Sequence, residues 1–275
     1  MAARFPLYDP NVQHDACGVG FVAARSTEAS HRIVKLGVTC LHNLDHRGAR
    51  SADGTGDGAG MMTRIPYRLL ERELRAIGIA APERERLGLV MAFLPRSSTG
   101  EARKTVEEAL SDNGIEILTW RTVPIGVNVL SPTAKASLPI IEQAIVTSTR
   151  SIESQDAFED SLFIARKAIE RVDVEGLDIV SASCRTVVYK GLFTADVIEE
   201  FYWDLRDPVF ESDFAVFHQR YSTNTHPAWE LAQPFRVLAH NGEINTVQGN
   251  RAWMVARSND LGDSVWGQRT EEIAP

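Results

Sequence analysis

The order in which extended and helical segments follow one another constrains the fold of this chain most. Apolar or β-branched segments that indicate strands occur at 17–24, at 61–65 and, late in the chain, at 214–221 and 235–239. No glycine-rich stretch between them has the fingerprint of a dinucleotide-binding turn that opens a helix. Because the strands gather at both ends of the sequence, an α+β fold with mostly antiparallel sheets is favoured over a parallel βαβ fold.

The middle of the chain alternates strands and helices, and the same periodicities predict their positions. Further strands are expected at 87–94, 115–123, 139–147 and 179–189. Helices are expected at 33–44, 66–77, 99–111, 158–172, 195–205 and 245–256. Neither a repeat nor a long linker divides the sequence, so we expect a single domain.

Composition argues against several classes of protein. The 275 residues are 44% hydrophobic and 24% charged, which is typical of a globular protein with a real core. A net charge of -8 argues against nucleic acid or an anionic membrane surface as the main partner. No apolar run reaches the ~20 residues of a membrane span, and residues 1–16 lack the apolar core of a signal peptide. Three widely spaced cysteines form no disulfide framework, which favours a reducing, cytoplasmic location.

A cysteine near the start of the chain is the first candidate for chemistry. Cys17 follows a turn-rich leader, residues 1–16, and Gly18 and Gly20 lie beside it. We hypothesise that the bond after Ala16 is cut, so that the leader is a propeptide and Cys17 becomes the N-terminus. Its α-amine, with an ordinary pKa of about 7.7–8, can then take up the proton of its own thiol. A buried structural cysteine is the alternative.

Two later stretches, 217–227 and 238–245, begin as apolar strands and end in polar residues, as sites at strand ends do. Arg220 in the first has the planar guanidinium that binds a carboxylate through two hydrogen bonds. Asn241 and Gly242 in the second offer a side-chain amide and an unhindered N–H, the donors that an oxyanion hole requires. A surface ion pair for Arg220 and a hairpin turn at the Asn-Gly pair are the alternatives.

Other polar clusters give little support for metal or nucleotide binding. Cys40 and His42 do not share a helix face, and with His46 they contain no paired cysteine motif, so no metal is expected. The glycine-rich loop 52–60 does not match a calcium loop, because the twelfth residue counted from Asp53 is an arginine. No lysine follows the loop as in a phosphate-binding loop. Two interpretations of this loop stay open: a flexible turn, or a segment that lines a pocket.

Five motifs occur in a fixed order along the chain. They are 15–21 (DACGVGF), 46–49 (HRGA), 53–60 (DGTGDGAG), 218–224 (HQRYSTN) and 240–245 (HNGEIN). Together they closely resemble the N-terminal glutaminase domain of glutamate synthase large subunits, a class II glutamine amidotransferase domain of the N-terminal-nucleophile hydrolase type. The resemblance implies an αββα sandwich of mostly antiparallel sheets over residues 17–275, after removal of the propeptide 1–16.

The same resemblance implies roles for individual residues. Cys17 would attack the side-chain amide of L-glutamine, releasing ammonia and leaving a thioester that water hydrolyses. Arg220 would hold the α-carboxylate of glutamine. Asn241 and Gly242 would form the oxyanion hole. Further substrate-binding candidates in these motifs are Arg47, Thr223, His226 and Glu243.

Complete enzymes of this family pass the ammonia to a synthase domain that aminates 2-oxoglutarate. That domain uses FMN and an iron–sulfur cluster, with electrons from an NADPH-oxidising subunit or ferredoxin. This chain is too short to hold it, so we expect no cofactor here and expect the missing synthase domains as partners. The family's Ser-Asp-Ser-type motif for the α-amino group is also absent from 1–275, and we expect this C-terminally truncated chain alone to bind glutamine weakly or not at all. A separate glutaminase subunit serving another acceptor, or a non-catalytic assembly or regulatory domain, are the alternatives.

Overall fold

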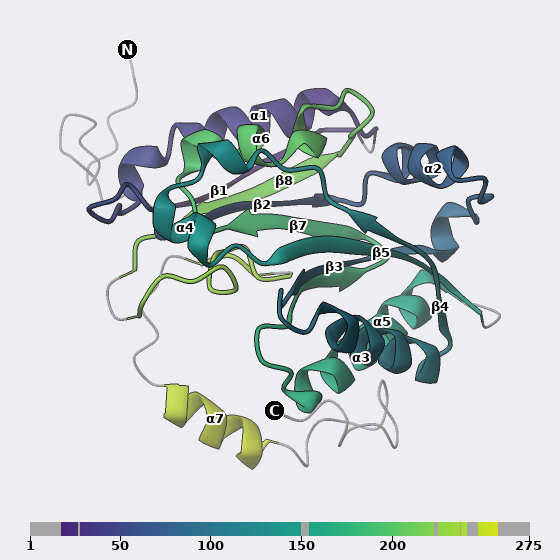
Figure 1. The fold of residues 1–275 in the computed structure, drawn as a ribbon. Helices are drawn as coiled ribbons and strands as arrows, with labels where there is room; N and C mark the ends of the chain where they lie inside the picture. Colours follow the sequence, from purple (N-terminus) through teal and green to yellow (C-terminus); the bar gives the residue numbers. More distant parts are fainter. Residues whose placement is uncertain are drawn as a thin grey trace.

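The computed structural model describes residues 18–26, 28–149, 154–222, 225–236, 238–240 and 247–257. Two four-stranded sheets lie face to face, and helices cover the outer face of each, which gives four layers (Figure 1). Every pairing between neighbouring strands is antiparallel. The predicted α+β class and αββα order of layers are therefore confirmed. Within the described ranges, no helix is long and apolar enough to cross a membrane.

The first sheet has the strand order β1-β8-β2-β7. Its strands are β1 (Val19–Ala23), β8 (Phe214–Gln219), β2 (Ala59–Arg64) and β7 (Thr186–Gly191). Helix α1 (His31–His42) covers its outer face at very short range. A Cβ on Gly37 would lie 2.7 Å from the Cβ of Ala215 and 2.9 Å from the sulfur of Met61. Strand β8 comes late in the chain and inserts between the two earliest strands.

The second sheet has the order β4-β5-β3-β6. Its strands are β4 (Ile115–Thr122), β5 (Ile140–Ser148), β3 (Leu87–Leu94) and β6 (Asp178–Ser183). Helices α3 (Thr99–Asp112) and α5 (Gln155–Val172) cover its outer face (Figure 1). All eight residues of β3 are buried, because alternate side chains point to these helices and to the first sheet. This explains its unbroken apolar sequence.

Shorter elements connect the layers. The other α-helices are α2 (Tyr67–Ala76), α4 (Pro132–Ala136), α6 (Ile198–Phe201) and α7 (Val247–Ala256). Short 3₁₀ helices occupy Asp45–Arg47, Arg84–Arg86, Val127–Val129, Ala195–Val197 and Trp203–Arg206. Helix α7 has no buried residue, and Trp253 within it is 72% exposed.

The segment predicted as one strand at 179–189 is two strands in two sheets, so that prediction is wrong. Strands β6 and β7 are separated by Cys184 and Arg185, and neither glycine nor proline marks the turn. Instead the hydroxyl of Ser183 accepts hydrogen bonds from the N–H groups of Arg185 and Thr186, at 2.9 and 3.0 Å. A serine side chain therefore makes the turn that periodicity missed.

Two other predicted elements also differ. Phe235 and Leu238 exchange two backbone hydrogen bonds of 2.6 Å, so the predicted strand 235–239 is a tight turn. Arg236 within it has a positive φ of 45°. The predicted helix 195–205 is broken into two 3₁₀ turns and the short α6. In the second of these places the apolar side chains of Ile198, Phe201 and Leu205 still reach the core from irregular backbone.

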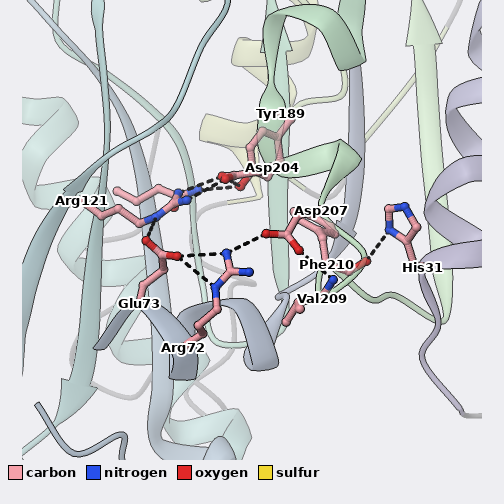
Figure 2. A network of polar contacts seen from close by, with 10 residues as sticks. His31, Arg72, Glu73, Arg121, Tyr189, Asp204, Asp207, Val209 and Phe210 are labelled. Carbon is pink, nitrogen blue, oxygen red and sulfur yellow. Dashed lines mark hydrogen bonds and ion pairs between the residues drawn. The ribbon is translucent and has the colours of Figure 1, made fainter. Parts of the chain in front are cut away.

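A buried polar network lies between the two sheets (Figure 2). Arg121 on β4 donates to both carboxylate oxygens of Asp204, at 2.6 and 2.8 Å, and its Nε lies 3.3 Å from Glu73. The hydroxyl of Tyr189 on β7 donates to Asp204 at 2.8 Å. Burial opposes the charge of Arg121, but the Asp204 carboxylate outweighs it and raises the pKa of the guanidinium. The network thus joins β4 of the second sheet to β7 of the first through Asp204, which accepts hydrogen bonds from both Arg121 and Tyr189.

Candidate active site

Strand β8 carries the first predicted site motif to one edge of the first sheet. The N–H of Gln219, its last residue, donates to the carbonyl of Gly18 at 2.6 Å. The N–H of Arg220 donates to the carbonyl of Gly58 at 2.8 Å. The start of β1 and the end of the glycine-rich loop therefore flank the end of β8. Cys17 precedes Gly18 and lies outside the described residues.

The buried side chain of Gln219 organises this edge. Its Oε1 accepts a hydrogen bond of 2.8 Å from the N–H of Ala195, and its Nε2 reaches the carbonyl of Arg220 at 3.4 Å. A Cβ on Gly48 would lie only 2.0 Å from that Nε2, so a larger residue there would displace the Gln219 side chain. Arg47, the residue before it, is partly buried at the end of its 3₁₀ helix. The 46–49 motif thus meets the end of β8.

Arg220 is partly buried and contacts only neutral oxygens within the described residues. Its Nη2 donates to the hydroxyl of Thr225 at 2.7 Å, and its Nη1 lies 3.4 Å from the carbonyl of Asp57. Burial lowers the pKa of Arg220, and the nearby Asp57 carboxylate opposes that shift. No ion pair joins this guanidinium to a carboxylate in the described part of the chain. It keeps donors suited to an incoming carboxylate. His226 lies nearby in sequence and is exposed.

The glycine-rich loop 52–60 lies beside Arg220 and is held by hydrogen bonds; we call this loop the Asp57 wall. Asp57 is 6% exposed, and its carboxylate accepts the N–H of Ser222 at 2.5 Å. At the other end of the loop, Asp53 accepts the N–H of Thr133 at 3.1 Å. Both ends are therefore held by carboxylate acceptors. These contacts argue against a flexible turn, and a pocket-lining role stays a prediction.

A pair of histidines links β8 to the second predicted motif. His218 is 1% exposed, and its ring lies against the backbone of His240. Burial lowers the pKa of His218 to about 4, so the ring is neutral near pH 7. The N–H of His240 donates to Oε1 of Gln233 at 2.9 Å. The residue that precedes Asn241 is therefore held near the end of β8.

The structure brings Arg47, Arg220 and the start of β1 to one edge, and it places His226 on the exposed loop beyond Arg220. Five predicted site residues lie outside the described residues: Cys17, Thr223, Asn241, Gly242 and Glu243. Sequence reasoning missed the buried contacts of Gln219 and Gln233. A buried amide at the end of an apolar strand was the available signal for Gln219.

The described ranges contain two cysteines, Cys40 and Cys184. There, no three or more His, Cys, Asp and Glu side chains are arranged to hold a metal ion. Cys40 lies on α1 and is partly buried, while Cys184 is buried at the β6–β7 turn, and both are free thiols. Burial and the Glu159 carboxylate raise the pKa of Cys184 well above its usual range. This thiol is therefore unreactive near neutral pH.

The fold and the order of these motifs define the class of protein to which the chain belongs. The chain matches the class-II glutamine amidotransferase family over residues 17–275, so it belongs to that family. Within the family it is similar to glutamate synthases, which confirms the predicted resemblance. It is 43% identical to the glutamate synthase [NADPH] large chain of Azospirillum brasilense, with 98% of this chain and 18% of that protein covered.

Two further relatives show how broad this similarity is. The chain is 42% identical to the chloroplastic ferredoxin-dependent glutamate synthase of Oryza sativa subsp. japonica, over 96% of this chain and 17% of the relative. It is 41% identical to the glutamate synthase [NADPH] large chain of Bacillus subtilis, over 98% and 18%. The chain therefore spans less than a fifth of the length of these relatives.

Proposed function

We propose that this chain is the glutaminase part of a glutamate synthase and hydrolyses the side-chain amide of L-glutamine to glutamate and ammonia. One observation carries the proposal. The start of β1, the end of β8, the glycine-rich loop and His240 meet at one edge of the first sheet. Described residues from motifs more than two hundred positions apart in the sequence thus lie together at this edge. The family match, which begins at residue 17, supports the same interpretation.

The nucleophile of the proposed reaction is Cys17, after removal of residues 1–16. Its α-amine takes the thiol proton, and the thiolate attacks the amide carbon of glutamine. Asn241 and Gly242 donate hydrogen bonds to the oxyanion that forms. The protonated amine then gives its proton to the leaving nitrogen, the C–N bond breaks, and ammonia departs. Water attacks the thioester, which releases glutamate and restores the thiol.

Arg220 is assigned the α-carboxylate of glutamine. Its guanidinium contacts a hydroxyl and a carbonyl, both neutral, so a substrate carboxylate adds a favourable charge pair without displacing another. The Asp57 wall fixes the neighbouring Ser222 and hence the loop on which Arg220 lies. Arg47, Thr223, His226 and Glu243 are proposed to line the rest of the pocket.

The complete enzyme is proposed to pass the ammonia to synthase domains that aminate 2-oxoglutarate. FMN and an iron–sulfur cluster are assigned to those domains, since Cys40 and Cys184 lie in different layers of this one. Relatives named for NADPH and for ferredoxin match with similar identity, 43% and 44%. The proposal therefore leaves the electron donor open between an NADPH-oxidising subunit and ferredoxin.

The test is ammonia release from L-glutamine by the mature, full-length protein. We expect release that Cys17→Ala and Cys17→Ser abolish, and N-terminal sequencing that begins at Cys17. Full activity in Cys17→Ala, or fully active protein that still begins at Met1 or Ala2, contradicts the mechanism. A wild-type protein that binds glutamine but releases no ammonia favours a non-catalytic domain.

A further inference from the structure

Lys190 is a buried ammonium that the proposed mechanism does not use. It lies on β7 at the end of an apolar run and is 2% exposed. Its Nζ donates to the carbonyl of Glu230 at 2.6 Å and lies 3.7 Å from the carboxylate of Asp178. Burial lowers the pKa of Lys190 to about 8, and Asp178 opposes that shift. A buried charge costs several kcal/mol unless its contacts compensate, so the contacts of this lysine are informative.

These contacts hold one stretch of chain, the 228–240 segment, of which residue 237 lies outside the described residues. Besides the Glu230 carbonyl, the ammonium lies 5.0 Å from the centre of the Phe235 ring. The segment also lies directly on the first sheet, since a Cβ on Gly60 would be 2.5 Å from the carbonyl of Gln233. Lys190 pairs with Gly60 across β2 and β7. The ammonium therefore fixes the segment at two points where it crosses this strand pair.

The segment leads from these anchors to the proposed oxyanion hole. Gln233, three residues after Glu230, accepts the N–H of His240 through its Oε1 at 2.9 Å. Asn241 follows His240 in the chain. Two hydrogen bonds, at Glu230 and at Gln233, thus connect β7 to the residue before the oxyanion donors.

We propose that Lys190 is a positioning residue for glutamine hydrolysis: it anchors the described part of the 228–240 segment up to His240, which precedes the proposed oxyanion donors Asn241 and Gly242 in the sequence. The inference rests on the proposed function. Arg220 is held separately, by its own hydrogen bond to Gly58 and by its place at the end of β8. Loss of Lys190 is therefore expected to disturb stabilisation of the transition state more than binding of glutamine.

Other charged groups around this lysine come from three elements. Asp178 belongs to β6, Glu230 and Arg236 belong to the segment, and Glu170 belongs to α5. Arg236 and Glu170 form an ion pair of 2.5 Å, but their side chains are 34% and 32% exposed. Exposed pairs of this kind contribute about 0–1 kcal/mol. The buried Lys190 contact is thus the stronger anchor of the segment.

The experiment compares Lys190→Met with wild type in the mature, full-length protein. Methionine fills a similar volume but donates no hydrogen bond to Glu230. We expect kcat for ammonia release to fall about 10- to 100-fold, because a misplacement of about 1 Å can cost that much. KM for glutamine is expected to stay within about threefold, as Arg220 keeps its own contacts. Lys135→Met, at an exposed lysine on α4, is the control and should match wild type.

Alkylation of Cys17 by iodoacetamide supplies a second measurement. The thiolate displaces iodide in this reaction and needs no oxyanion hole, so Lys190→Met should react at the wild-type rate. An unchanged kcat overturns the inference. So does a parallel loss of kcat and alkylation, which indicates a collapsed site.

If Lys190→Met lacks a cooperative melting transition, Lys190→Gln replaces it, because this shorter polar side chain cannot reach Glu230. The values of kcat, KM and the rate of Cys17 alkylation are then interpreted as for Lys190→Met. Absence of ammonia release in wild type, or its persistence in Cys17→Ala, contradicts the proposed function instead of the role of Lys190.

Discussion

Two arginines in this molecule, Arg121 and Arg220, carry the same charge in very different surroundings. Arg121 lies between the sheets, is 9% exposed, and contacts carboxylates of Asp204 and Glu73 (Figure 2). Arg220 lies at the edge of the first sheet and contacts a hydroxyl and a carbonyl. The first arginine has its counter-charges within the protein. The second has hydrogen bonds that position it but no carboxylate partner within the described residues, which agrees with its proposed role in binding the carboxylate of the substrate.

The same difference extends to the neighbours of each arginine. In the inter-sheet network, the Tyr189 hydroxyl both donates to Asp204 and accepts from Gln143, at 2.8 and 2.9 Å. At the edge, neither ring nitrogen of the buried His218 makes a hydrogen bond within the described residues. A fully paired buried network supports architecture, whereas a buried polar ring without such partners adds nothing to stability and calls for another explanation.

The strongest test of this comparison is removal of a carboxylate from the paired network. Asp204→Ala leaves Arg121 charged and buried without its main partner, so we expect the free energy of unfolding to fall by about 3–5 kcal/mol. Asp196→Ala, at an exposed ion pair with Arg50, should cost less than about 1 kcal/mol. Urea denaturation of both variants measures this. Equal costs for the two variants would show that the network is not structural.

The second prediction concerns His218 at the edge of the first sheet, and it is tested by the pH dependence of the free energy of unfolding. Because the folded-state pKa of His218 is about 4 and an unfolded histidine has about 6.5, the unfolded state binds the extra proton between these values. Stability therefore falls as pH decreases from about 6.5 to 4, by up to about 3 kcal/mol from this group. His218→Leu should flatten that slope, and His46→Leu, at an exposed histidine, should not. An identical slope in His218→Leu and wild type would be inconsistent with a neutral buried ring.

Removal of the guanidinium at the edge should affect function more than stability. For Arg220→Met we expect kcat/KM for glutamine to fall about 100-fold, mainly through KM, since a charged hydrogen-bonded pair is worth about 1.5–3 kcal/mol. The free energy of unfolding should change by less than about 1 kcal/mol. Steady-state kinetics and urea denaturation give the two values. Arg206→Met, at an exposed arginine, serves as control. If Arg220→Met lost as much stability as Asp204→Ala, the difference proposed between the two arginines would be wrong.

The smallest effect is expected at the wall beside Arg220. Asp57→Asn keeps the shape of the side chain but weakens the hydrogen bond from Ser222, because the acceptor loses its charge. We expect KM for glutamine to rise about 3- to 10-fold, equivalent to about 1 kcal/mol. Glutamine kinetics at fixed pH measure the change. An unchanged KM would mean that the wall does not help to position Arg220.

Much of the fold was predictable where burial leaves a clear pattern in the sequence. Strand β3 was predicted with its observed bounds, since a strand covered on both faces shows an unbroken apolar run. Helix α3 was predicted to within one residue because its apolar positions have helical spacing. The edge site was predicted as a set of motifs, and the structure brings the described members together.

Other features depend on contacts that sequence patterns do not encode. The turn between β6 and β7 depends on the hydroxyl of Ser183, and a serine gives a weak turn signal. The position of β8 between β1 and β2 is decided by pairing across nearly two hundred residues. The role of Lys190 depends on a carbonyl forty residues away, at Glu230, to which its side chain donates.

Because β8 lies between β1 and β2, the first sheet can form only late in translation. The two earliest strands emerge from the ribosome first, yet neither contacts the other until a strand made more than one hundred and fifty residues later arrives. Pairing across such a separation is slow, because a long loop must close first. Any processing of the leader that requires a finished first sheet must therefore wait until most of the domain has been translated. The nascent chain thus carries Cys17, the proposed nucleophile, through most of translation before the strands that would surround it have paired.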